Sequence, residues 1–197
     1  MDKKQLISFF DGSASAWDAK SPPGAFALLE QIVRKINIRP DDFVLDVGCG
    51  TGALRPFLLA YNPQEILHMD ISSKMLEELN RKFPDAQTLC ADFETEILPR
   101  NYFDKAVAYN VFPHFTDHES VFYNAHACLK PGGVFVIAHG QTRGELARSH
   151  GKYNEVKKDL LPPGEKIFEL YEKAGFKNIK VRERDPGFFA SGFKDLV

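Results

Sequence analysis

The stretch from Val44 to Gly52 constrains the fold of this chain most strongly, because an apolar strand runs there straight into three glycines at alternate positions. Residues 43–47, FVLDV, have the apolar and β-branched character of a buried strand, and a helix-like segment follows the glycines. Glycine has no Cβ, so such a turn can adopt positive φ and a ligand can come within hydrogen-bond distance of the backbone. The stretch therefore predicts a strand–loop–helix unit whose loop binds a ligand.

Short apolar runs alternate with helix-like segments along the rest of the chain. We expect strands at residues 43–47, 65–69, 86–90, 103–110 and 134–139, and helices at 54–61, 72–83 and 119–130. This order predicts an α/β fold with a doubly wound, Rossmann-like sheet that is mostly parallel and has helices on both faces. Two further runs, 178–185 and 187–193, predict a C-terminal antiparallel hairpin at the sheet edge, which brings the sheet to seven strands.

Length and charge limit the classes of function. A chain of 197 residues has the size of one domain. Its formal net charge of −2 creates no global field that would attract nucleic acid or an anionic membrane, so we expect a small molecule as its partner. The three cysteines are widely spaced and odd in number, which favours reduced thiols and a cytoplasmic location. The first residues lack the sustained apolar run of a signal peptide or a membrane span.

The chain is expected to form a single domain, 1–197, with four parts. Residues 1–40 form an N-terminal helical cap, in which aromatic side chains precede an amphipathic helix. Residues 41–139 form the ligand-binding core, and 140–163 form a polar lid that is broken by glycines and prolines. Residues 164–197 supply a last helix and the hairpin. No zipper pattern occurs, so the sequence leaves the oligomeric state open.

Acidic residues follow the expected strands at the edge where open α/β sheets bind their ligands. Asp46 lies just before the glycines, where its carboxylate could hold a ligand ammonium group directly or through water. Asp70 ends the second strand, twenty residues after Gly50, and Asp92 ends the third. A Lys-Pro-Gly-Gly turn, residues 130–133, precedes the fifth strand.

In combination, these motifs resemble the class I S-adenosylmethionine-dependent methyltransferases of the small type 11-like branch, over roughly residues 40–140. The resemblance implies S-adenosylmethionine as cofactor and S-adenosylhomocysteine as product. By this resemblance, the methionine part of the cofactor is surrounded by Asp46, Gly48, Cys49, Gly50 and Gly52. The ribose hydroxyls bind Asp70, the adenine packs on Ile71 and Met75, and the adenine amino group meets Asp92 and Phe93. Beneath the methyl sulfonium lie Asn110 and Val111.

Two other functions compete with methyl transfer. The glycines also satisfy a loose dinucleotide pattern, and Tyr153 and Lys157 have the spacing used by short-chain dehydrogenases, which would suit an NAD(P)-dependent oxidoreductase. Against this, the Asp46 carboxylate would repel a pyrophosphate. A helix in the lid is the more natural interpretation of residues 153–157. The third possibility is a module that binds S-adenosylmethionine and transfers nothing.

Methyl transfer by in-line displacement requires mainly alignment and exclusion of water, and it needs a base only where the acceptor is weakly acidic. His114 and His139 are the candidate catalytic bases, and both are expected to face the cleft. We expect no metal site, because His114, His139 and His150 lack the close spacing of metal ligands. Two further sets of side chains could meet the acceptor, although a solvated lid and ordinary packing explain them equally well: Arg143, Glu145, His150 and Tyr153 in the lid, and Phe9, Phe10, Phe112 and Phe115.

Overall fold

The computed structural model describes residues 3–20, 25–151, 156, 158–184 and 187–196. Its helices and strands follow one another along the chain as α1 (Lys3–Ser13), α2 (Ala25–Ile36), β1 (Phe43–Val47), α3 (Arg55–Leu59), β2 (Glu65–Asp70), α4 (Ser73–Lys82), β3 (Gln87–Cys90), β4 (Phe103–Tyr109), α5 (His118–Cys128), β5 (Leu129–His139), α6 (Arg143–His150), α7 (Gly164–Lys173), β6 (Lys177–Arg184) and β7 (Gly187–Phe193). Short 3-10 turns lie at Ala14–Ala16, Asp18–Lys20 and Phe112–His114.

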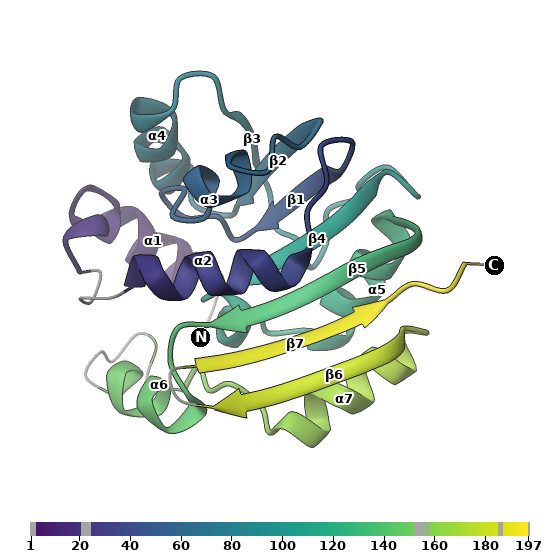
Figure 1. Ribbon diagram of the computed structural model, residues 1–197. Coiled ribbons are helices and arrows are strands. Elements are labelled where there is room, and N and C mark those ends of the chain that lie inside the picture. The colour runs from purple at the N-terminus through teal and green to yellow at the C-terminus, as the bar shows by residue number, and fades with distance from the viewer. Residues whose placement is uncertain (1–2, 21–24, 152–155, 157, 185–186, 197) are drawn as a thin grey trace.

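The described residues form one seven-stranded sheet in the order β3-β2-β1-β4-β5-β7-β6 (Figure 1). Neighbouring strands among β1 to β5 are parallel, whereas β7 is antiparallel to both β5 and β6. The predicted doubly wound sheet with a C-terminal antiparallel hairpin is therefore confirmed. The second strand of the hairpin inserts beside β5, so β6 forms the edge.

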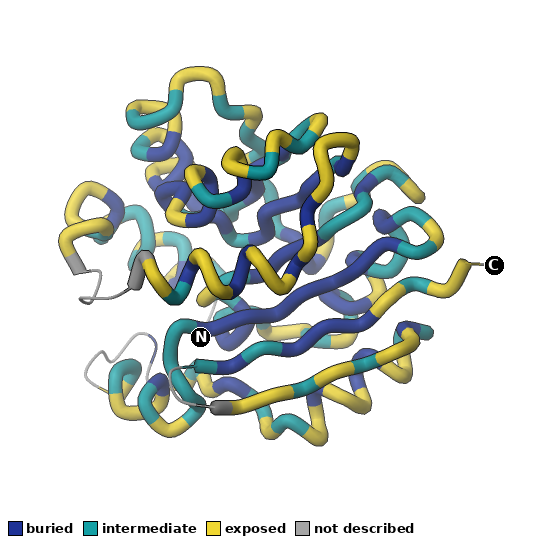
Figure 2. The backbone as a smooth tube through the Cα atoms, in the orientation of Figure 1, coloured by how far each residue is buried: buried dark blue, intermediate teal, exposed yellow. Residues whose placement is uncertain are grey.

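Helices cover both faces of the sheet, as predicted. α2 crosses the front face in Figure 1, whereas α5 and α7 lie behind the sheet. Leu29, Ile32 and Val33 recur on one side of α2 and pack with the β-branched residues of the central strands in one core cluster. A larger cluster fills the opposite face, where Ile167 and Tyr171 of α7 are buried. Figure 2 shows the central strands as the most buried part of the chain.

The expected alternation fails between β3 and β4, because described residues 91–102 contain no helix. The main-chain carbonyl of Asp92 accepts hydrogen bonds from the N–H groups of Thr95 and Glu96, which closes a turn directly after β3. Residues 96–99 have no regular structure, and a turn at residues 100–101 precedes β4. The turn directly after β3 keeps Asp92 at the carboxyl end of that strand, the edge at which open α/β sheets bind ligands.

Two helices were not expected from the apolar spacing. α1 buries only Leu6, so its apolar pattern is weak. α6 begins at a capping box in which the Thr142 side chain accepts from the Glu145 N–H and the Glu145 carboxylate accepts from the Thr142 N–H. The helix expected at 153–157 cannot be compared, since residues 152–155 and 157 lie outside the described ones.

The five parallel strands end along one edge of the sheet, toward the left of Figure 1, where α1 and α6 lie. The cap and the lid therefore both lie at the carboxyl ends of the strands. This is the edge at which open α/β sheets bind ligands.

Candidate functional site

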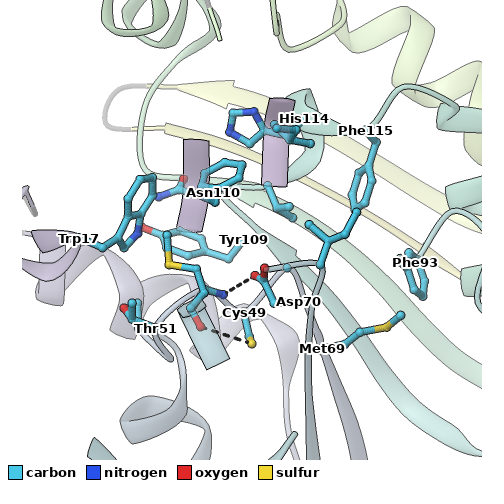
Figure 3. Close-up of a pocket in the computed structure, with 18 of the residues that line it drawn as sticks. Trp17, Cys49, Thr51, Met69, Asp70, Phe93, Tyr109, Asn110, His114 and Phe115 are labelled. Carbon is cyan, nitrogen blue, oxygen red and sulfur yellow. Dashed lines mark hydrogen bonds between the residues drawn. The ribbon is translucent and has the colours of Figure 1, made fainter. Parts of the chain in front are cut away.

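A pocket of about 460 Å³ lies between the N-terminal cap and the carboxyl ends of the strands (Figure 3). Most of the residues singled out in the sequence line it: Gly48, Cys49, Gly50, Asp70, Ile71, Met75, Asp92, Phe93, Asn110, Val111 and His114. Asp46, Gly52 and His139 are not part of its lining. Residues from Gly48 to His114, 66 positions apart in the chain, therefore share one cavity.

The glycines of the loop have different structural roles. Gly48 has φ +64°, and a Cβ at this position would lie 2.3 Å from Cγ2 of Val111, so the packing of the loop against the end of β4 requires glycine. Gly50 has φ +55°, and the nearest atom to a Cβ there would be Nε1 of Trp17, at 4.0 Å. Gly52 faces the side chain of Leu79, away from the pocket. Only Gly50 leaves open space that a ligand can use.

Asp70 is fixed against the loop by backbone donors. Its Oδ2 accepts from the Gly50 N–H at 2.8 Å, and its Oδ1 accepts from the Ser72 N–H at 2.9 Å. Burial raises the pKa of the Asp70 carboxyl to about 6, with a further upward contribution from Asp46, while the backbone hydrogen bonds oppose the shift. The two oxygens keep lone pairs that can accept from hydroxyl groups of a ligand.

Asp92 lies at the end of β3 and pairs with a lysine of the cap. Lys3 of α1 forms ion pairs with Asp92 and with Oε2 of Glu94, the latter at 2.8 Å. Burial lowers the pKa of Lys3, but the hydrogen bonds and charges of the two carboxylates outweigh it and raise the pKa overall. The first turn of α1 is therefore fastened to the rim of the pocket.

Two more contacts fasten the cap to the core. Asp11 accepts from the Ser72 hydroxyl, and Asp18 pairs with both the Thr51 hydroxyl and Lys82. Together with Lys3, these contacts join the cap to the glycine loop and to the segments that follow β2 and β3.

Asn110 and Val111 lie where β4 ends. Asn110 has φ +55°, a conformation that asparagine tolerates better than most residues. Its Oδ1 accepts from the Gly140 N–H at 2.9 Å, which links the end of β4 to the start of the lid. Figure 3 shows Tyr109 and Asn110 on the same side of the pocket as Trp17.

Asp46 is not placed as expected. Its side chain is buried, and its Oδ2 accepts from Nδ1 of His68 on the adjacent strand, at 2.9 Å. Strand register sets Asp46 beside His68, so the carboxylate has a partner within the core. The prediction that this carboxylate faces a ligand ammonium is wrong for this structure.

His139 does not face the cleft either. Its imidazole is 1% exposed, and neither ring nitrogen has a hydrogen-bond partner in the described part of the chain. Burial, with smaller contributions from His114 and His150, lowers its pKa to about 3. A buried, neutral ring with so low a pKa cannot take a proton from an acceptor in the pocket, which corrects the expectation that His139 is a base.

His114 does line the pocket. Its Nδ1 lies 2.8 Å from Oδ2 of Asp159 in the lid, and its ring stacks on that of His150, with centroids 5.2 Å apart. Phe10 of the cap meets the ring edge-on at 5.1 Å. Asp159 was not predicted from the sequence, because it lies 45 residues from His114 in a polar segment.

The aromatic residues divide between the pocket and the core. Phe10 and Phe115 line the pocket together with Trp17, whose ring lies 5.5 Å from that of Phe10. Phe112 is fully buried and packs on Phe122 instead. Phe9 contacts Phe10 but does not line the cavity.

The polar lid residues are used mainly within the lid. Arg143 donates from Nε to the carbonyl of Leu161, Glu145 caps α6, and His150 donates from Nδ1 to the carbonyl of Asp159. Tyr153 and Lys157, the pair that a dehydrogenase would need, lie outside the described residues.

The described residues contain neither a cluster of metal ligands nor a helix that could cross a membrane. No group of three or more His, Cys, Asp or Glu side chains among them could hold a metal ion. None of their helices has the length and apolar character needed to cross a bilayer.

Comparisons with known proteins agree with the geometry. The family model described as "Methyltransferase domain" matches residues 45–137, from β1 to β5. A malonyl-(acyl-carrier protein) O-methyltransferase of Acetivibrio thermocellus is 30% identical over 185 residues, which are 87% of this chain and 63% of the relative. The fold matches that of a Haemonchus contortus phosphoethanolamine N-methyltransferase 2 bound to S-adenosylhomocysteine, with a TM-score of 0.75, 20% identity, and coverage of 88% of this chain and 53% of the other. The matched residues identify a methyltransferase domain, and the chain has the fold of the class I S-adenosylmethionine-dependent methyltransferases.

This methyltransferase is also similar to a longer relative. Phosphoethanolamine N-methyltransferase 1 of Zea mays is 25% identical over 193 residues, which cover 95% of this chain. The chain spans only 37% of the length of that relative. The likeness therefore concerns one methyltransferase unit and not the whole relative.

The pocket of this methyltransferase fits the cofactor of its family on two observations. The space in front of Gly50 is open, so a ligand can lie against the backbone of the loop. Asp70 stands beside that space with its carboxylate already oriented by two backbone donors. These are the features that a ribose next to a glycine loop requires.

Proposed function

We propose that this methyltransferase transfers a methyl group from S-adenosylmethionine to a small-molecule acceptor. The observation that carries the proposal is the composition of the pocket: Gly50 and Asp70 line it at the loop, while Phe10, Trp17 and Phe115 supply aromatic surface in the same cavity. A mainly apolar cavity with a few polar groups suits a small molecule.

In this proposal, the cofactor lies along the carboxyl ends of β1 to β4. Asp70 accepts from the ribose hydroxyls, Ile71 and Met75 contact the adenine, and Asp92 with Phe93 meets the adenine amino group. Gly48, Cys49 and Gly50 border the methionine part, and Asn110 and Val111 lie beneath the reacting centre. All of these residues line the pocket, which supports the assignment.

When bound, S-adenosylmethionine supplies an electrophilic methyl group whose transfer forms the bond to the acceptor and breaks the bond to sulfur. The chain's own residues align the acceptor and exclude water, which provides most of the rate enhancement in such a reaction. The cap supports exclusion of water, because three polar contacts fasten it to the glycine loop and to the segments after β2 and β3. In this proposal, His114 takes the proton when the acceptor must lose one.

Several observations favour a small acceptor over a macromolecule. The net charge of −2 gives nucleic acid no general attraction. The acceptor named for the Zea mays relative is phosphoethanolamine, a small molecule, although that of the Acetivibrio relative is attached to a carrier protein. Cys49, Cys90 and Cys128 are free thiols, which supports a reducing compartment such as the cytoplasm.

The decisive experiment follows a labelled methyl group. The purified protein is incubated with methyl-deuterated S-adenosylmethionine and a cell extract that has been divided by ultrafiltration, and both fractions are analysed by mass spectrometry. We expect S-adenosylhomocysteine and a deuterated product in the low-molecular-mass fraction. Label confined to protein or nucleic acid would contradict a small acceptor. Binding of S-adenosylmethionine with no methyl transfer to either fraction would identify a non-catalytic module.

A further inference from the structure

His114 and Asp159 form a dyad that joins the floor of the pocket to the lid. His114 follows β4 in the turn Phe112–His114, whereas Asp159 lies beyond α6. We propose that Asp159 is a positioning residue that makes His114 a general base, and that the acceptor carries a hydroxyl group that must lose its proton. This inference rests on the proposed methyl transfer and names the acceptor class of the same pocket.

The hydrogen bond between the two residues determines which ring nitrogen is free. An ionised carboxylate only accepts, so Nδ1 of His114 carries the proton and donates it to Oδ2 of Asp159, at 2.8 Å. Within the described residues, Nε2 of His114 forms no hydrogen bond, and the side chain lines the pocket. The nitrogen with the lone pair is thus the one available to an acceptor.

Two elements hold the dyad in place. His150, at the end of α6, donates from Nδ1 to the main-chain carbonyl of Asp159 at 2.6 Å and stacks on His114. Phe10 of α1 packs edge-on against the other side of the site. The side chains of His114 and Asp159 are 10% and 12% exposed, so the hydrogen bond lies in a largely dry environment, where it orients the ring effectively.

The charges around His114 suit a ring that becomes protonated during the reaction. Asp159 supplies the negative charge that stabilises an imidazolium. His150 and His139, two histidines near His114, both have a lowered pKa, chiefly through burial. Both shifts disfavour a second positive charge beside His114.

The dyad would be superfluous for an acceptor that is already a strong nucleophile, such as a thiolate or a tertiary amine. It fits an alcohol or phenol, whose O–H proton passes to Nε2 of His114 while the oxygen forms its bond to the methyl carbon. The bonding electron pair of the broken carbon–sulfur bond stays on sulfur. The proton on His114 then leaves to solvent. The aromatic wall of Phe10, Trp17 and Phe115 favours a hydroxyl group on an apolar or aromatic molecule.

The tautomer of His114 can be measured without an acceptor. Long-range ¹H–¹⁵N correlation spectra of the protein with S-adenosylhomocysteine distinguish the Nδ1–H from the Nε2–H form, and His114→Gln identifies the signal. We expect the Nδ1–H form in the wild type and a shift toward Nε2–H in Asp159→Ala. Glu165→Ala, which removes an exposed carboxylate near the same segment, should leave the spectrum unchanged. An Nε2–H ring in the wild type would overturn the dyad, whether or not the Asp159 variant folds.

The acceptor class is tested with substituted phenols of increasing acidity, ending at 4-nitrophenol, and with aromatic thiols and tertiary amines as comparison. Asp159→Ala should lower kcat about a hundredfold for weakly acidic phenols, with little change in KM, and much less for 4-nitrophenol, which ionises without help. The affinity for S-adenosylmethionine should not change. Equal losses for every phenol, or methylation of thiols and amines alone, would overturn the inference while leaving methyl transfer itself intact. Transfer of label to macromolecules only would instead contradict the proposed function.

Discussion

His68 on β2 donates a hydrogen bond from Nδ1 to Oδ2 of Asp46 on β1, at 2.9 Å, with both side chains shut off from solvent. The other ring nitrogen of His68 accepts from Nη1 of Arg55 at 3.2 Å, and Nη2 of Arg55 reaches Asp85 at the surface, at 2.7 Å. A series of hydrogen bonds thus connects Asp46 on β1 to Asp85 at the protein surface. The carboxylate next to the glycine loop is held by the protein and does not depend on a ligand.

Removing His68 should destabilise the fold, because it leaves the Asp46 carboxylate buried without its partner. We expect His68→Leu to lower the free energy of unfolding by about 3 kcal/mol, the upper end of the usual cost of leaving a buried acceptor without its donor. Urea unfolding of the protein without ligand measures this. Asp46→Asn is the matched control: its amide oxygen can still accept from Nδ1, so the loss should be smaller. Equal losses in the two variants would argue against a charge-dependent role for the pair.

The same pair shows what the sequence could and could not reveal. The strand and the glycine loop were predictable because their apolar and glycine patterns are local, and so was the parallel sheet that follows from alternation. The partner of Asp46 was not, since it depends on strand register, which sets His68 opposite Asp46. Asp159 was missed for a similar reason: only the fold of the lid brings it to His114.

Pocket residues that lie at or shortly after the end of a strand could be predicted from the sequence. Asp70, Met75 and Asn110 line the pocket because each lies near the end of a parallel strand, and those ends must meet at one edge. His139 also ends a strand, but its ring is buried, which the position along the strand does not specify. Sequence reasoning therefore located the edge correctly and misjudged the direction of individual side chains.

Gly48 and Gly50 should respond differently to substitution. Gly48→Ala places a methyl group 2.3 Å from Val111, so we expect a loss of about 1–3 kcal/mol in unfolding free energy. Gly50→Val should largely keep the fold, apart from about 1–2 kcal/mol of strain from positive φ, but it should abolish S-adenosylmethionine binding. Urea unfolding and calorimetric titration separate the two effects. Normal affinity in Gly50→Val would mean that the loop does not contact the cofactor.

Asp70 should make cofactor affinity depend on pH. Its pKa lies at about 6 in the protein without ligand, and hydroxyl donors of a ribose favour the ionised form. The ionised fraction falls about tenfold between pH 7 and pH 5, so the apparent dissociation constant for S-adenosylmethionine should rise by about the same factor. Calorimetric titration across this range measures it.

Asp70→Ala is the matched variant for that titration. It should weaken binding at pH 7 by about 1–3 kcal/mol, because charge-assisted hydrogen bonds are lost, and it should remove the pH dependence near pH 6. A wild-type affinity that stays constant from pH 5 to pH 8 would be inconsistent with a ribose held by this carboxylate.

His139 should make the fold sensitive to acid. Its pKa is lowered to about 3 in the folded chain, from 6.5 for the free group, so the unfolded chain binds the extra proton between these values. Unfolding is therefore favoured as the pH falls from 6.5 toward 3, by about 1.4 kcal/mol for each pH unit, and this cost is absent above pH 6.5. His139→Leu removes the titrating ring and its two unpaired nitrogens, so its unfolding free energy should decline less steeply over that range. Urea unfolding of both proteins from pH 4.5 to pH 7.5 tests this, and parallel curves would show that the buried ring takes up a proton without unfolding.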